Sequence, residues 1–208
     1  MLNFENLDKA VYSGAGAYDI PELPPVADVP ATEAVCKAEW IPFNFAKSCN
    51  APEGKGVHFF VDDYQFVRVW NSPDKYIPLL KRFAAVLAPD FSTYSDMPRA
   101  MQIYNHYRKH WVARYLADSG ITAIPTISWS TPDSYEWCFD GEPRNSVVAI
   151  STVGCMKGEA RELFLMGLEE MKRRLYPTQI ICYGAEIDGC INIPPYYRKI
   201  KERLNGNN

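Results

Sequence analysis

The stretch GVHFFVDD, residues 56–63, gives the clearest indication of the fold class. It is a short run of apolar and aromatic residues that ends at two aspartates. A strand with one wet face alternates apolar and polar residues, whereas a strand buried on both faces reads as a continuous apolar run. The segment therefore predicts a buried strand of a parallel sheet.

Six further runs of this kind occur along the chain, and segments with helical patterning separate most of them. Strands alternating with helices predict an α/β fold with a mostly parallel sheet. We expect a small or incomplete (β/α) barrel, with an open doubly wound sheet as the alternative. No glycine-rich nucleotide-binding motif follows any of the runs. The other strand-like runs are residues 39–45, 84–92, 121–130, 146–155, 178–188 and 190–195, and the helix-like segments are residues 72–83, 95–120, 131–141, 157–177 and 194–204.

The first 35 residues differ in composition from the rest. They contain IPELPPVADVP, residues 20–30, and proline fixes φ and removes a hydrogen-bond donor. We therefore predict an extended proline-rich arm over residues 1–35 and a single α/β domain over residues 36–208. The arm either wraps the domain or packs across a second subunit, which leaves a homodimer open.

The charge pattern argues against two classes of partner. The 208 residues carry a formal net charge of -3, without a run of Lys and Arg, so there is no strong signal for nucleic-acid binding. No apolar stretch is long enough to span a bilayer, and the N-terminus lacks the pattern of a signal peptide. These features predict a cytoplasmic protein that does not bind membranes.

Polar and aromatic residues follow the predicted strands at their carboxyl ends, where parallel α/β folds bind ligands. Asp62 and Asp63 follow one strand and Asp90 follows the next, so we expect an acidic, aromatic pocket there. The candidate catalytic residues are Asp63 and Asp90, with Asp62 and Glu186 as lesser candidates; the candidate ligand-binding residues are Asn44, Tyr64, Ser92, Trp129, Ser130, Ser151, Thr152 and Tyr183.

Three functions fit such a pocket. Paired carboxylates can act as acid and base, or as acid and nucleophile, on a glycosidic bond. The same carboxylates can hold a divalent metal ion, Mg²⁺ or Mn²⁺, for chemistry on a phosphoester. The pocket can also bind a sugar, a nucleotide or a host protein without catalysis. Against all three, Asp62 and Asp63 would only begin a helix if the segment DYQFVRVW, residues 63–70, is helical.

Two histidines have metal-ligand spacing. His106 and His110 are four residues apart on the long predicted helix, a spacing that can place two imidazoles on one zinc ion. The pair lies off the predicted apolar stripe of that helix, so we expect both side chains to be exposed to solvent. His58, inside the strand 56–63, is expected to be a core residue.

Several of these segments together resemble the family called domain of unknown function 4417. The resemblance covers roughly residues 40–184 and rests on the strings IPFNFAKS, VHFFVDDYQFVRVW, LAPDFSTYSDMP, IPTISWS, CFDG, VAISTVGC and IICYG. It implies a single-domain cytoplasmic protein of bacteria, phages or mobile elements, with roles in replication or in countering host defence. It carries no activity, substrate or catalytic residue over to this chain.

Overall fold

A computed structural model describes residues 9–195. Each of the seven predicted runs overlaps one strand of the structure. Each of these strands is short, and most residues of each one except β9 are buried. The strands are β3 Glu39–Pro42, β4 Lys55–His58, β5 Ala85–Leu87, β6 Ala123–Ile124, β7 Val147–Ser151, β8 Gln179–Tyr183 and β9 Ile191–Ile193.

All pairs among these strands are parallel, which confirms the predicted sheet type. One sheet has the order β3-β4-β5-β6 and the other has the order β7-β8-β9. A bridge between Thr126 and Ala149 connects them, with the Ile127 N–H donating to the Ala149 carbonyl at 2.7 Å. The order follows the chain without the reversal that defines a doubly wound sheet. Within the described residues β9 does not pair with β3, so no closed barrel forms.

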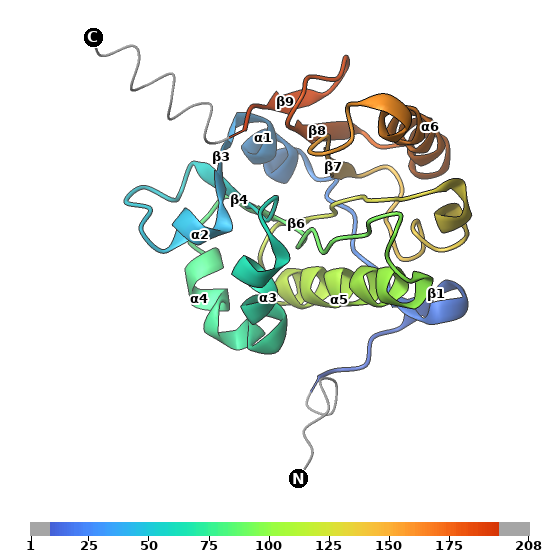
Figure 1. The fold of residues 1–208 in the computed structure, drawn as a ribbon. Coiled ribbons are helices and arrows are strands. Elements are labelled where there is room, and N and C mark those ends of the chain that lie inside the picture. The colour runs from blue at the N-terminus through green and yellow to red at the C-terminus, as the bar shows by residue number, and fades with distance from the viewer. Residues whose placement is uncertain (1–8, 196–208) are drawn as a thin grey trace.

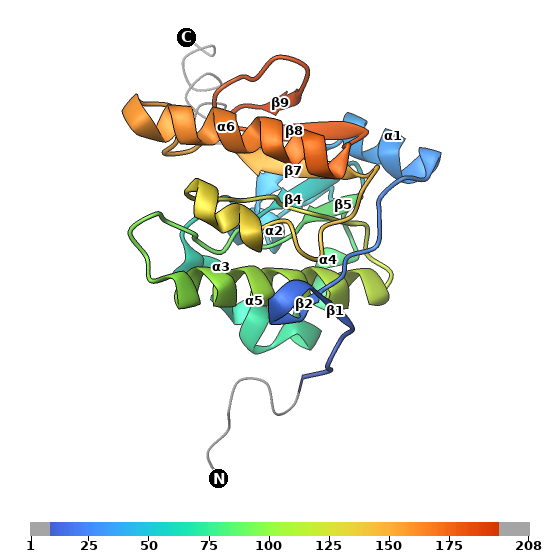
Figure 2. The same ribbon diagram turned by 90° about the vertical axis from the view of Figure 1, so that its right-hand side faces the viewer.

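Helices lie on both sides of the strands. Figure 2 shows α6 over β7 and β8, whereas α3 and α5 lie on the opposite side of the molecule. No helix in the described part of the chain is both long and apolar enough to cross a membrane. The helices are α1 Val29–Lys37, α2 Phe43–Ala46, α3 Asp63–Asn71, α4 Ile77–Leu80, α5 Arg99–Asp118 and α6 Gly158–Leu175, with 3₁₀ turns η1 Gly16–Tyr18, η2 Pro73–Lys75 and η3 Pro132–Glu136.

The predicted long helices are confirmed as α5 and α6, but two shorter predictions are only partly right. Residues 72–83 form η2 and then α4, and Pro78 lies in the first turn of α4, where its missing N–H costs least. Residues 131–141 form only the turn η3. The helix expected over residues 194–204 lies almost wholly outside the described residues.

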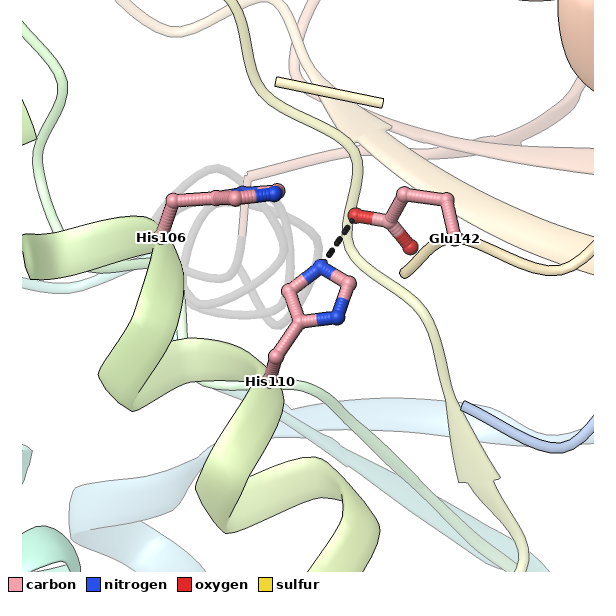
Figure 3. Close-up of side chains that lie close together, drawn as sticks. All are labelled: His106, His110 and Glu142. Atoms are coloured by element: carbon pink, nitrogen blue, oxygen red, sulfur yellow. Dashed lines mark hydrogen bonds and ion pairs between the residues drawn. The ribbon is translucent and has the colours of Figure 1, made fainter. Parts of the chain in front are cut away.

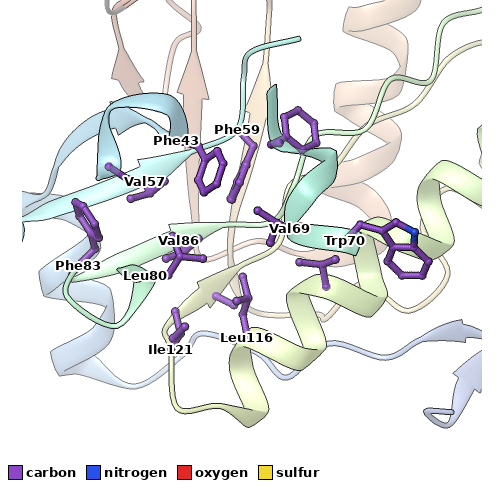
Figure 4. Packing of buried hydrophobic residues seen from close by; sticks show 14 of the residues in the cluster. Phe43, Val57, Phe59, Val69, Trp70, Leu80, Phe83, Val86, Leu116 and Ile121 are labelled. Atoms are coloured by element: carbon purple, nitrogen blue, oxygen red, sulfur yellow. The ribbon is translucent and has the colours of Figure 1, made fainter. Parts of the chain in front are cut away.

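The core has separate clusters on the two faces of the strands, which explains their continuous apolar sequences. Val57 and Val86 pack with residues of α3, α4 and α5 in one cluster (Figure 4). Val148 and Cys182 pack against α6 in a second cluster. The opposite faces of the strands meet in a third cluster that includes Trp40, Leu87, Ala149 and Ile181.

The predicted extended arm is partly wrong. Residues 29–35 belong to α1, because Asp28 caps the helix by accepting the Ala31 N–H and proline is tolerated in a first turn. Before it, β1 Gly14–Ala15 and β2 Ile20–Pro21 pair as a short antiparallel hairpin. The arm is tied to the domain at Val26, whose N–H donates to the Ser146 hydroxyl at 2.8 Å. Residues 1–8 of the predicted arm lie outside the described residues.

The acidic pair of the opening stretch stands at a helix start. Asp62 occupies the N-cap position of the helix α3, which is labelled in Figure 1, and Asp63 lies in the first turn of that helix. The Asp62 side chain makes no capping hydrogen bond. Asp90, by contrast, lies in the loop between β5 and α5. The segment DYQFVRVW is therefore helical, the alternative that the sequence left open, and Asp63 begins a helix whereas Asp90 stands in a loop.

Candidate functional site

A cavity of about 420 Å³ lies at the carboxyl ends of four neighbouring strands, where the sequence predicts a pocket. The segments that follow β4, β5, β6 and β7 contribute most of its wall, and α6 closes one side. Its lining residues are Phe60, Val61, Asp62, Asp90, Phe91, Ser92, Thr93, Tyr94, Ser95, Ile127, Ser128, Trp129, Ser130, Ser151, Val153, Gly154, Cys155, Ala160, Leu163 and Phe164.

The lining combines aromatic rings, hydroxyl groups and two carboxyl groups. None of the lining residues is a lysine, an arginine or a histidine. A site for phosphate groups usually offers cationic side chains or a helix N-terminus. Aromatic faces and hydroxyl groups instead suit a neutral ligand that has an apolar face and a polar edge.

Asp90 is the acid most changed by the fold. Removal from water raises its pKa to about 7; the nearby Lys109 ammonium partly offsets this rise, and the Asp63 carboxylate adds to it. A carboxyl group with a pKa near neutrality can both donate and accept a proton at physiological pH. Asp90 therefore has the properties of a general acid or base within the cavity.

Asp63 stands behind the cavity wall and is not among the lining residues. Its carboxylate accepts hydrogen bonds from the Ser92 hydroxyl at 2.9 Å and from the Ser92 N–H at 3.2 Å. Arg108 lies 3.8 Å from the same carboxylate and places its guanidinium 3.7 Å from the centre of the Phe91 ring. These contacts hold the loop that carries Asp90.

The structure places six of the twelve predicted site residues in the cavity wall. They come from four strand ends that are far apart in the sequence, as the parallel topology requires. The Ser130 hydroxyl donates to the Gln102 side chain at 2.8 Å, and the Ser151 hydroxyl accepts the Val153 N–H at 3.2 Å. The six residues are Asp62, Asp90, Ser92, Trp129, Ser130 and Ser151.

The other predicted residues have surroundings of their own. The buried Thr152 hydroxyl accepts the Ala185 N–H at 2.6 Å and supports the turn after β8. Tyr183 is buried against the rings of His58 and Phe60. Asn44 donates to the Gln65 side chain at 2.9 Å. Tyr64 and Glu186 are exposed and, like Asp63, are not among the lining residues.

Trp129 forms the side of the cavity next to α6. Its ring packs against Phe164, and it lies so close to Gly167 that a Cβ there would be 2.1 Å from the indole Nε1. The glycine thus makes room for the tryptophan inside a long helix. Cys155, another lining residue, has a pKa raised by burial and by Asp90, which disfavours a reactive thiolate.

A second cluster of chemically active residues lies on α5. His106 and His110 are both buried, so the prediction that they are exposed is wrong. The polar face of α5 is covered by the segment after β6 and by the N-terminal hairpin rather than by water. Figure 3 shows both rings directed toward Glu142, and the His110 Nε2 lies 2.9 Å from its carboxylate.

Glu142 was missed by sequence reasoning, because it lies far along the chain from both histidines in a loop without a recognisable motif. Its carboxylate also accepts a hydrogen bond from Lys109 at 2.8 Å, and both side chains are buried. Although burial opposes ionisation, Lys109 and His110 together lower the pKa of Glu142. The loop thereby holds a buried carboxylate against α5.

The profile of the family described as domain of unknown function (DUF4417) matches residues 12–194. The chain belongs to the DUF4417 family. It is 38% identical over 177 residues to the Gene 1 protein of Mycobacterium phage D29, and 39% identical over 179 residues to the Gene 1 protein of Mycobacterium phage L5. Each match covers 85% of this chain, but 64% of the D29 protein and 75% of the L5 protein. No solved structure matches the chain.

The matched DUF4417 region contains both groups of residues. The cavity, Asp90 and the His106–His110–Glu142 cluster all lie within residues 12–194. Sequence reasoning located the first group, because its residues directly follow strands. It misjudged the second, whose burial depends on a loop and a hairpin that pack over one face of α5.

Proposed function

We propose that this phage-related DUF4417 protein binds a small neutral ligand in the strand-end cavity of an incomplete (β/α) barrel and cleaves a glycosidic bond in it. The ligand class is a sugar or a nucleoside. The observation that carries the proposal is Asp90, a cavity-lining carboxyl group with a pKa raised to about 7. Such a group can protonate a leaving oxygen or nitrogen at neutral pH.

Asp62 is the second carboxyl group of the cavity wall and the partner that we propose for Asp90. It is exposed at the start of α3, and Gln65 donates to it at 3.3 Å. In glycosidases one carboxyl group acts as the acid while a second acts as base or nucleophile. Asp90, withdrawn from water, suits the first role, and the solvent-facing Asp62 suits the second.

The absence of cationic groups from the cavity wall favours a glycosidic over a phosphoester substrate. Phosphate groups carry charge that would lie next to two carboxyl groups without a lysine or arginine to balance it.

The rings of the cavity would contribute binding energy and orientation. Trp129 and Phe60 offer apolar faces on which a base or a sugar ring can stack. The hydroxyl groups of Ser92, Ser130 and Ser151 would donate to or accept from ligand hydroxyls. The proposal thus assigns roles to residues from all four strand ends without requiring a cofactor.

An assay with two sets of substrates tests this function. The purified chain is incubated with nitrophenyl glycosides and with nucleosides, and release of nitrophenol or free base is measured. Turnover that falls at least about 100-fold in Asp90→Asn, while Asp96→Asn, at an exposed residue outside the cavity wall, retains it, supports the proposal. Binding of a sugar or nucleoside without turnover in the parent protein would instead favour a non-catalytic binding role for the same cavity.

A further inference from the structure

We propose that His106, His110 and Glu142 form a binding site for a divalent transition-metal ion, with zinc as the best match. The site is independent of the proposed glycosidic activity, because none of its residues lines the strand-end cavity. Two histidines and one glutamate are a ligand set that zinc uses in proteins. The spacing of the histidines, four residues apart on α5, places both on one side of the helix.

In each imidazole ring, one nitrogen is hydrogen-bonded to a backbone carbonyl oxygen. His106 Nε2 lies 3.1 Å from the Asp140 carbonyl oxygen, and His110 Nδ1 lies 2.8 Å from the Pro21 carbonyl oxygen. A carbonyl only accepts, so each of these nitrogens carries the hydrogen. This is the outer hydrogen bond that orients histidine ligands in metal sites, and it directs the other ring nitrogen toward the ion.

Figure 3 shows the two imidazole rings and the Glu142 carboxylate group directed toward one another. One atom from each of the three side chains lies within 4.8 Å of the other two. His106 Nδ1 and Glu142 Oε2 are buried, and neither has a hydrogen-bond partner among the described residues. Buried polar atoms are nearly always satisfied, so a lone pair and a carboxylate oxygen left without partners need an explanation. A metal ion bound by the His106 ring and the Glu142 carboxylate group would give both groups a partner.

Lys109 does not block the site, but its positive charge disfavours the binding of a metal ion. Its ammonium group donates to Glu142 Oε1 and to the Thr126 carbonyl, and Glu142 Oε2 has no hydrogen-bond partner among the described residues. The nearby positive charge would weaken binding of a dication. Lys109→Met should therefore bind zinc more tightly than the parent protein, provided that it folds.

The site would join three parts of the fold. Gly141, between Asp140 and Glu142, has a φ of 73°, and a Cβ there would lie 2.6 Å from the Pro21 carbonyl oxygen and 2.8 Å from His110 Nδ1. Its carbonyl accepts the Leu23 N–H at 2.9 Å. Helix α5, the loop 140–142 and the segment after β2 therefore meet here. An ion at this junction would stabilise the folded protein by mass action.

Zinc titration of the full chain tests the proposal. The protein is stripped with a chelator and titrated with Zn²⁺ in competition with a chromophoric chelator, and the absorption spectrum with Co²⁺ is recorded. We expect one ion per chain and binding at least about tenfold weaker in His106→Gln and Glu142→Gln. The glutamine at position 106 retains a side-chain donor for the Asp140 carbonyl.

His58→Gln is the matched control, since it changes a buried histidine outside the cluster. It should bind zinc as the parent protein does. Circular dichroism establishes that each variant is folded, and where His106→Gln is not, the parent protein decides: its melting temperature should rise with Zn²⁺ and stay unchanged with Mg²⁺. Equal zinc affinity in His106→Gln and the parent, or no zinc binding by the parent at micromolar concentrations, would overturn the proposal.

Discussion

Asp63 and Ser92 are joined by two hydrogen bonds, although 29 residues separate them in the sequence. The Ser92 hydroxyl and N–H both donate to the Asp63 carboxylate, at 2.9 Å and 3.2 Å. Ser92 lies two residues after Asp90 in the loop that follows β5. Asp63 thus fixes the loop that carries the proposed acid and acts on the cavity from outside its wall.

Replacing Asp63 with alanine should destabilise the protein and loosen this loop. Two donors of Ser92 would lose their acceptor, which we expect to lower the free energy of unfolding by about 1–3 kcal/mol. Urea unfolding measures the change. Asp62→Ala is the control, because Asp62 is exposed and should change the free energy by less than about 0.5 kcal/mol. Equal losses in both variants would contradict a positioning role for Asp63.

Asp90 makes stability depend on pH. Its pKa is 3.8 when unperturbed and about 7 in the folded protein, so between these values the folded state binds more protons than the unfolded state. Stability must then fall as the pH rises from about 4 to 7. Asp90→Asn removes this loss and should be more stable than the parent by about 1–3 kcal/mol at pH 8, with no such gain at pH 4. If urea unfolding gives the same difference in unfolding free energy between the two proteins at pH 4 and at pH 8, the raised pKa is contradicted.

Much of the fold could be predicted because the strands are buried on both faces. The apolar run around Val57 has no polar alternation, because one face of β4 packs toward α3 and the other packs toward Tyr183 of β8. Six of the predicted site residues were located for a related reason: the carboxyl ends of parallel strands share one edge. Asp90 and Trp129 could therefore be placed together without knowing any contact.

The rest depends on tertiary contacts that local patterns do not contain. His106 and His110 have the sequence surroundings of exposed residues, but the loop with Glu142 and the carbonyl of Pro21 cover them. The helix α1 was missed because proline suggests extended chain, although it is compatible with a first helical turn. Whether Asp63 begins a helix or stands in a loop depends on the residue at which α3 starts, which the sequence does not fix.

Gly167 should be intolerant of alanine, contrary to its place inside a helix. Alanine normally stabilises a helix relative to glycine by about 0.5–1 kcal/mol. Here the added Cβ would meet the Trp129 ring at 2.1 Å, so we expect Gly167→Ala to destabilise the protein by about 1–3 kcal/mol. The smaller ring in Trp129→Phe should recover part of this loss in the double variant. If the losses from Gly167→Ala and Trp129→Phe simply add in thermal unfolding, the contact with the Trp129 ring is not the reason that alanine is unfavourable at position 167.

Replacing Lys109 alone should lower the free energy of unfolding more than replacing Lys109 and Glu142 together. In protein kept metal-free by a chelator, Lys109→Met leaves Glu142 with one fewer partner in a buried site, and we expect a loss of about 3–5 kcal/mol. The double variant with Glu142→Met should lose less than the single variant, since no unpaired buried charge remains. A double-mutant cycle by urea unfolding gives the coupling, and a double variant less stable than the single one would contradict the buried pair.

A thermal-shift comparison of neutral ligands with their phosphorylated counterparts tests whether the strand-end cavity selects neutral ligands. The parent protein and Trp129→Ala are each heated with sugars and nucleosides, and with the corresponding sugar phosphates and nucleotides. A ligand that binds only the folded state raises the melting temperature. We predict a rise with a neutral sugar or nucleoside, a smaller rise with its phosphate, and loss of both in Trp129→Ala. An equal or larger rise with the phosphorylated ligands, or none with any neutral ligand, would contradict the account.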